Sequence, residues 1–139
     1  MASKDYSGTP LPKKLGIKEG LKVAFVGQPA TFRSTLGPLP PSSRVRPQVR
    51  GPLDVIVYFD TRRTSLRRRF RSLAKALSPS GGLWIAWPKK SSRMTTDLSF
   101  DEVQSIGLEA GLVDNKSCSI DDNWQALRFV IRRKDRPLA

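Results

Sequence analysis

Three apolar runs in this chain each end in residues that could bind a ligand. Gly27-Gln28 follows residues 22–26, Asp60-Thr61-Arg62 follows residues 53–59, and Lys89-Lys90 follows residues 82–88. In an open parallel sheet the carboxyl ends of the strands meet at one edge, and ligands bind there. Arg62, Lys89 and Lys90 would give that edge a basic rim suited to an acidic or phosphorylated ligand. The alternative is that all three are loop charges that face water.

The same edge holds the candidate cofactor-binding residues Gly27, Gln28 and Asp60. A glycine after a buried strand lets the backbone approach a ligand, and a carboxylate after a neighbouring strand can accept a hydrogen bond from it. Each residue also has a simpler interpretation. Gly27 could serve only the turn, and Asp60 could cap the helix that follows it.

A second basic group lies on the helix expected at about residues 64–77. Its apolar stripe, with helical spacing, consists of Leu66, Phe70, Leu73 and Leu77. Arg67, Arg68, Arg71 and Lys75 fall on the opposite side and could follow the phosphates of a nucleic acid. A solvated charged face is the alternative.

Several kinds of chemistry are excluded by composition. The chain has no histidine and one cysteine, Cys118, so it lacks Ser-His and Cys-His nucleophiles and the commonest zinc ligand. Cys118 is expected to be an unreactive strand residue, because no imidazole can activate it. We therefore identify no catalytic residue and no metal site.

The bulk properties indicate one domain with an anionic partner. A chain of 139 residues with 38% hydrophobic residues can bury a core without disulfides. No apolar run is long enough to span a bilayer, and the N-terminus has no signal-peptide pattern, so we expect a cytoplasmic protein. The net charge of +13 favours an anionic small molecule or nucleic acid, although heavy arginine usage alone could produce it. A protein partner and the oligomeric state are left open.

The order of elements predicts an α/β fold. Residues 54–88 read as strand, helix and strand, which is the unit of a parallel sheet. A short helix at 29–36, an edge strand at 44–50 weakened by Pro47, and a hairpin at about 112–120 and 124–132 complete the sheet. We expect a three-layer, mostly parallel, Rossmann-like sheet over residues 21–139, with residues 1–20 as a leader that packs on it.

One more helix is expected after residue 99. Ser99 and Glu102 form a capping box, in which each side chain binds the other residue's amide. The helix is expected to bury Phe100, Val103, Ile106 and Ala110 and to stop at Gly111.

Taken together, residues 23–27, 54–60 and 73–88 and the terminal hairpin resemble class I S-adenosylmethionine-dependent methyltransferases. That family has seven strands, and residues 28–53 leave room for one helix and one strand, so the chain would be a truncated form. The resemblance implies S-adenosylmethionine as the possible cofactor, held near Gly27, Gln28 and Asp60. Phe25, Pro29 and Thr31 depart from the family's acidic and glycine-rich pattern, so the core would be degenerate.

The chain as a whole also resembles a small bacterial domain family of unknown function. The blocks that carry this resemblance are Tyr6–Leu11, Lys13–Ile17, Gly81–Trp84, Trp87–Lys89 and Gly111–Lys116. No activity accompanies it.

Three functions follow from these observations. The preserved strands and altered loop favour a non-catalytic binding or regulatory module for an anionic ligand. The alternatives are a methyltransferase with an atypical loop and a nucleic-acid-binding protein that uses the basic helix face.

Overall fold

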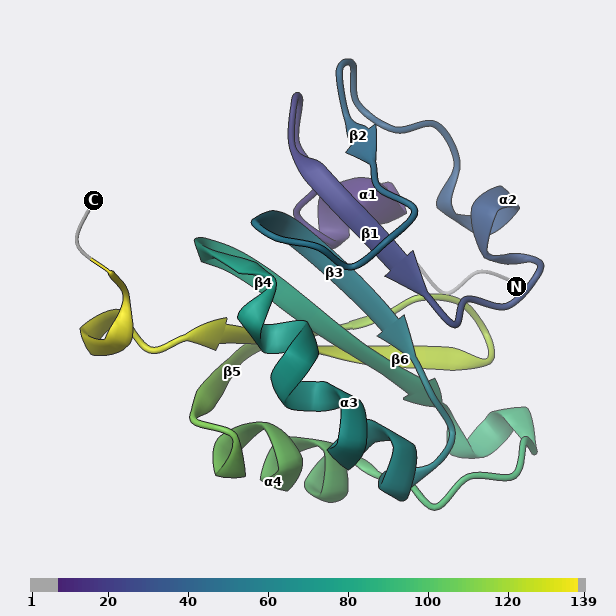
Figure 1. Cartoon of the computed structure of the whole chain (residues 1–139). Coiled ribbons are helices and arrows are strands. Elements are labelled where there is room, and N and C mark those ends of the chain that lie inside the picture. Colours follow the sequence, from purple (N-terminus) through teal and green to yellow (C-terminus); the bar gives the residue numbers. More distant parts are fainter. Residues whose placement is uncertain (1–7, 138–139) are drawn as a thin grey trace.

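A single mixed sheet forms the centre of the molecule (Figure 1). The computed structural model describes residues 8–137. The strands are β1 (Lys22–Val26), β2 (Arg44–Val45), β3 (Leu53–Phe59), β4 (Leu77–Pro88), β5 (Leu112–Ser119) and β6 (Trp124–Ile131), in the order β2-β1-β3-β4-β6-β5. The first four are parallel, and β6 and β5 form an antiparallel hairpin against β4. This is the predicted Rossmann-like fold with a C-terminal hairpin.

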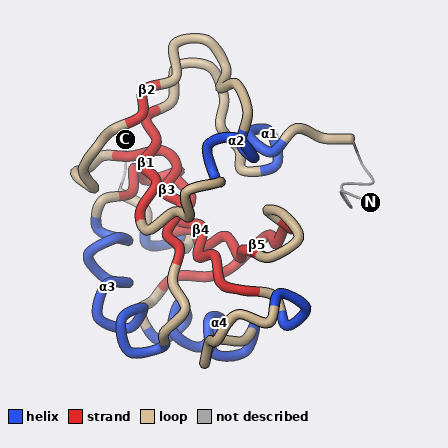
Figure 2. The backbone as a smooth tube through the Cα atoms, turned by 90° about the vertical axis from the view of Figure 1, so that its right-hand side faces the viewer, coloured by secondary structure: helices blue, strands red, loops and turns tan. Residues whose placement is uncertain are grey.

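Helices cover both faces of this sheet and produce three layers (Figure 2). The helices α3 (Arg63–Lys75) and α4 (Phe100–Glu109) bury Leu66, Phe70 and Val103 against the first face. The much shorter α1 (Leu11–Lys14) and α2 (Phe32–Leu36) cover the second face. Two short 3-10 turns, at Lys90–Ser92 and Arg133–Asp135, lie in the loops. No helix among residues 8–137 is both long and apolar enough to cross a membrane.

The central strands are buried on both sides because their residues alternate between two apolar cores. Ile56 and Tyr58 of β3 face α3, whereas Val57 and Phe59 face α1 and α2. Trp84 and Trp87 of β4 point to opposite faces in the same way, as their spacing predicts.

The chain before β1 docks on the second face. Leu11, Leu15 and Ile17 are buried there in the same cluster as Trp84. The indole Nε1 of Trp84 donates a hydrogen bond to the backbone oxygen of Leu15 at 2.9 Å. Tyr6 and Ser7 of the first sequence block lie outside the described residues, as does the rest of the leader before Gly8.

The transition from α3 to β4 differs from the sequence prediction. The helix ends at Lys75, and Leu77 already pairs with Leu53 as the first residue of the strand. The segment between Leu77 and Gly82, expected to be a turn, is instead an irregularity within the strand, after which Val55 pairs with Gly82. Three extra residues on β4 are accommodated there, and the two strands keep their parallel pairing on either side of the irregularity.

The start of α4 corrects two further predictions. The Ser99 hydroxyl accepts from the Glu102 amide at 3.3 Å, but the Glu102 carboxylate binds Arg63 of α3 at 3.0 Å rather than closing the capping box. Phe100, expected in the core, is 44% exposed. The helix turns Val103 and Ile106 to the sheet, and this leaves its first residue on the surface.

Candidate ligand-binding site at the carboxyl ends of the strands

The order of strands reverses at β1 and β3. The chain passes from β1 to β2 on one side, then returns to place β3 and β4 on the other. In parallel sheets this arrangement opens a crevice outside the carboxyl ends of the two strands. Gly27 and Gln28 after β1, and Asp60 after β3, are therefore at the expected edge.

Gly27 has a packing requirement of its own. Its φ is +71°, and a Cβ on this residue would lie 2.7 Å from the backbone oxygen of Phe59. Any other residue would push β1 away from the end of β3. This accounts for the glycine without a ligand, and its role in cofactor binding stays a prediction.

The Asp60 carboxylate is engaged by groups of the protein. Oδ2 accepts from the Tyr58 hydroxyl at 2.5 Å, and Oδ1 accepts from the amides of Thr61 (2.7 Å) and Arg62 (3.1 Å) and the hydroxyl of Ser65 (2.9 Å). Burial, followed by this hydrogen bond to Asp60, raises the pKa of the Tyr58 phenol. Asp60 therefore organises the turn between β3 and α3.

Asp60 is not the N-cap residue of α3, which corrects the simpler interpretation. The N-cap position belongs to Arg62, whose side chain makes no capping bond. Asp97, from the loop before α4, accepts from the amide of Arg63 at 2.7 Å. This contact could not be predicted from the sequence, because Asp97 lies 34 residues after Arg63.

The residues at this edge do not fit S-adenosylmethionine in the way the methyltransferase resemblance implies. Phe25 occupies the acidic position and packs edge-to-face on Phe32 at 5.1 Å, and Phe32 packs on Phe59 at 4.9 Å. Pro29 has no amide to offer a carboxylate. The carboxylate of Asp60 already accepts four hydrogen bonds, so it has little capacity left for a ribose hydroxyl.

A groove of about 830 Å³ lies at the carboxyl end of β4, between this strand and the start of α4. Lys89 and Lys90 line it, as do the exposed side chains of Met94 and Phe100. Trp87 forms part of the wall and contacts Phe100 edge-to-face at 6.4 Å. Cations thus stand beside an apolar surface in one groove.

Hydrogen bonds fix the loop that forms the far side of the groove. The Thr61 carbonyl, in the turn between β3 and α3, accepts from the Thr96 hydroxyl at 2.7 Å and the Asp97 amide at 3.3 Å. Thr96 Oγ1 in turn accepts from the amide of Leu98 at 3.0 Å. The groove is thereby tied to the β3–α3 turn.

The predicted basic rim is assembled in part. Lys89 and Lys90 both line the groove, whereas Arg62 does not belong to its lining. The Lys89 ammonium donates to the Ser119 hydroxyl at 2.7 Å, and Lys90 has no ion-pair partner among residues 8–137. Lys90 is therefore the cation most available to a ligand. Sequence reasoning missed Met94 and Phe100, since exposure at a groove depends on tertiary packing.

Two of the four basic residues on α3 contact the neighbouring helix α4, and two do not. Arg67 forms an ion pair with Glu109 of α4 at 3.1 Å, and Arg71 donates to the Glu109 backbone oxygen at 3.3 Å. Arg68 and Lys75 have no such partner in the described part of the chain. All four residues are exposed, as expected for a solvent face, but Arg67 and Arg71 also contact α4, which packs along that side of the helix. Their role in binding nucleic acid stays a prediction.

No metal site is visible in the described residues. Within 8–137, no three His, Cys, Asp or Glu side chains gather closely enough to hold an ion. Burial raises the pKa of Cys118 to about 11, although Lys14, Lys116 and Lys89 act in the opposite direction. Its thiol is therefore protonated and unreactive at neutral pH.

Comparison with solved structures supports the fold. A SAM-dependent methyltransferase from Aquifex aeolicus is 17% identical, with a TM-score of 0.58 over 84% of this chain and 85% of that one. A fibrillarin pre-rRNA processing protein from Methanococcus jannaschii is 15% identical, with a TM-score of 0.60 over 94% and 70%. A TehB-like SAM-dependent methyltransferase from Corynebacterium glutamicum has a TM-score of 0.52 at 13% identity, over 82% of each chain.

No family model and no curated protein matches the sequence. The resemblance to a small bacterial family is thus not supported by these comparisons, and the identities to solved structures are too low to carry an activity across. The chain has the fold of class I S-adenosylmethionine-dependent methyltransferases, with six strands.

Proposed function

We propose that the protein binds an anionic organic ligand in the groove at the carboxyl end of β4. One observation carries this proposal: Lys89 and Lys90 line the same groove as the exposed side chains of Met94 and Phe100. A ligand with a negative group and an apolar or aromatic body would satisfy both kinds of wall.

The fluorescent anion 8-anilinonaphthalene-1-sulfonate is a suitable probe, because it combines a sulfonate with aromatic rings. We expect Lys90→Ala and Phe100→Ala each to weaken its binding severalfold. Leu108→Ala is the matched control for Phe100, since it is on the same helix, is 42% exposed and lies outside the groove lining. Lys75→Ala is the corresponding charge control. Equal binding by all four variants would contradict the proposal.

Methyl transfer is the second candidate, and the comparisons favour it over a non-catalytic module. Its support is the likeness to solved methyltransferases. The residues around Gly27 argue against methyl transfer, because Pro29, Phe25 and Asp60 provide few free hydrogen-bonding groups for the cofactor. Calorimetric titration with S-adenosylhomocysteine tests it directly. One-to-one binding in the micromolar range would make methyl transfer the leading function, and no heat up to millimolar ligand would reject it.

A further inference from the structure

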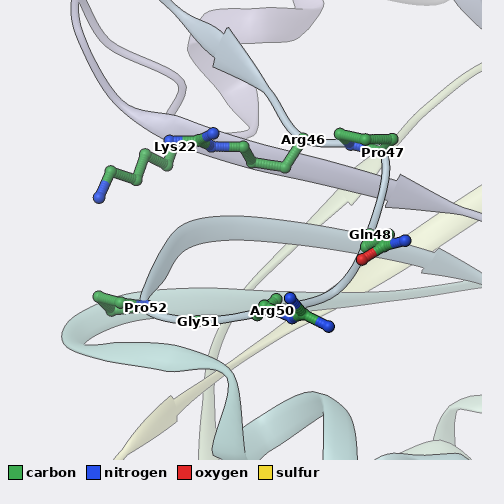
Figure 3. A pocket seen from close by; sticks show the side chains of 7 residues that line it. All are labelled: Lys22, Arg46, Pro47, Gln48, Arg50, Gly51 and Pro52. Atoms are coloured by element: carbon green, nitrogen blue, oxygen red, sulfur yellow. The ribbon is translucent and has the colours of Figure 1, made fainter.

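A second basic site lies far from the groove, at the outer edge of the sheet. A pocket of about 280 Å³ is lined by Lys22, Arg46, Pro47, Gln48, Arg50, Gly51 and Pro52 (Figure 3). Three of these residues are cations, and none is acidic. None was singled out from the sequence as a ligand-binding residue.

The fold brings these cations together. Lys22 begins β1 and pairs in register with Arg44 of β2, which ends one residue later. The chain then turns back through residues 46–52 to enter β3. The Arg46 side chain extends back along β1 toward Lys22, and the loop carrying Gln48 and Arg50 borders the other side (Figure 3).

The charges in this pocket are not neutralised by the protein. The side chains of Lys22, Arg46 and Arg50 have no ion-pair partner within the described chain. Asp54 is outside the pocket lining, and its carboxylate accepts from the backbone amide of Lys22 at 2.9 Å and the Ser78 hydroxyl at 3.2 Å. Gathering like charges is unfavourable, so a bound anion would stabilise this arrangement.

The shape of the pocket indicates which anion it suits. Small-molecule sites usually enclose most of the ligand surface, but here Arg46, Pro47, Gln48 and Arg50 are all exposed. The lining contains no aromatic residue on which a single-stranded base could stack. Arginine side chains bind phosphate oxygens through two parallel hydrogen bonds. These features suit the backbone of a duplex, contacted without reading its sequence.

We propose that Lys22, Arg46 and Arg50 form an interface for the phosphate backbone of duplex nucleic acid. This interface differs from the α3 face suggested by the sequence, where Arg67 and Arg71 are engaged by Glu109. It is also independent of the groove, with which it shares no lining residue.

The test is the salt dependence of binding of a fluorescently labelled mixed-sequence DNA duplex to the full chain. Each phosphate contact contributes a slope of about 0.9 in log K against log salt. The triple variant Lys22→Ala, Arg46→Ala and Arg50→Ala removes three cations, so we expect its slope to fall by about 2 to 3. The matched control, Arg67→Ala, Arg68→Ala and Arg71→Ala, removes the same charge and is expected to change the slope much less.

Further variants keep the test decisive. If the triple variant does not fold, Arg46→Gln with Arg50→Gln changes exposed loop residues alone and should lower the slope by about 1 to 2. The double variant Arg46→Lys with Arg50→Lys keeps both positive charges and should retain most of the salt-dependence slope. Equal loss of slope in the two triple variants would overturn the proposal, because net charge alone would then explain binding. No binding of the duplex by the unmodified chain, or binding of inorganic phosphate without the duplex, would overturn it as well.

Discussion

The ring of Phe129 lies directly against the backbone of Gly107, so that a Cβ at position 107 would overlap Cε1 of this ring. Gly107 is a buried residue inside α4, where glycine is normally the poorer choice by about 1 kcal/mol. Here the missing side chain lets the helix approach β6. This contact explains how α4 packs closely against the C-terminal hairpin.

We therefore predict that Gly107→Ala destabilises the protein by about 1 to 3 kcal/mol, as overpacking does in other cores. The gain in helix propensity would not offset this clash. Urea unfolding measures the change, and the exposed Ser105→Ala in the same helix is the control, with little effect expected. Gly107→Ala combined with Phe129→Leu should recover part of the loss. A neutral or stabilising single substitution would contradict the contact.

Replacing Trp84 by Phe tests the docking of the N-terminal segment. The substitution removes the donor to the Leu15 backbone oxygen and leaves a buried acceptor unpaired, at a cost of about 1 to 3 kcal/mol. Trp87→Phe is the comparison, because Trp87 is similarly buried but its indole makes no hydrogen bond within the described chain. The Trp84 variant should unfold at the lower urea concentration. Equal midpoints would argue against a contribution from this bond.

The Tyr58 phenol should resist ionisation in the folded protein. Its pKa is raised by burial and by Asp60, so the folded state holds its proton more tightly than the unfolded chain. The resulting stability is complete below pH about 10, the usual pKa of tyrosine, and is lost as pH rises further. Absorbance at alkaline pH should show a tyrosine ionisation that is delayed until the protein unfolds. Tyr58→Phe should abolish the delayed step.

Cys118 should react slowly with a disulfide reagent. Its pKa of about 11 means that little thiolate exists at pH 8, and the rate should rise steeply up to pH 10. Unfolding in urea should bring the rate to that of an ordinary cysteine. A fast reaction in the native protein at pH 8 would show that the thiol is more accessible than its burial indicates.

Much of the fold was predictable because local patterns and tertiary packing agree. The apolar runs at β1, β3 and β4 and the stripe Leu66, Phe70 and Leu73 each fit one element. The prediction failed where a residue interacts with a partner that is distant in the sequence. Glu102 binds Arg63 instead of its own helix end, and Leu77 joins a strand because Leu53 is available as a partner.

The candidate site was less predictable for a related reason. Lys89 and Lys90 could be placed, since the carboxyl end of a strand has a known position. The apolar surface beside them could not, because the exposure of Met94 and Phe100 follows from how α4 sits on the sheet. The pocket at the edge of the sheet likewise depends on the loop of residues 46–52. This loop has no regular secondary structure, so its path could not be predicted from its own residues.

The shortness of β2 also affects how the protein behaves in a crowded solution. An edge strand with a long row of free amides and carbonyls invites pairing with another chain. Here β2 ends after two residues, Pro47 follows shortly, and Arg44 and Arg46 bring positive charge to the border of the sheet. Two copies that approached through their β2 edges would repel one another, so these residues disfavour strand pairing at this edge of the sheet.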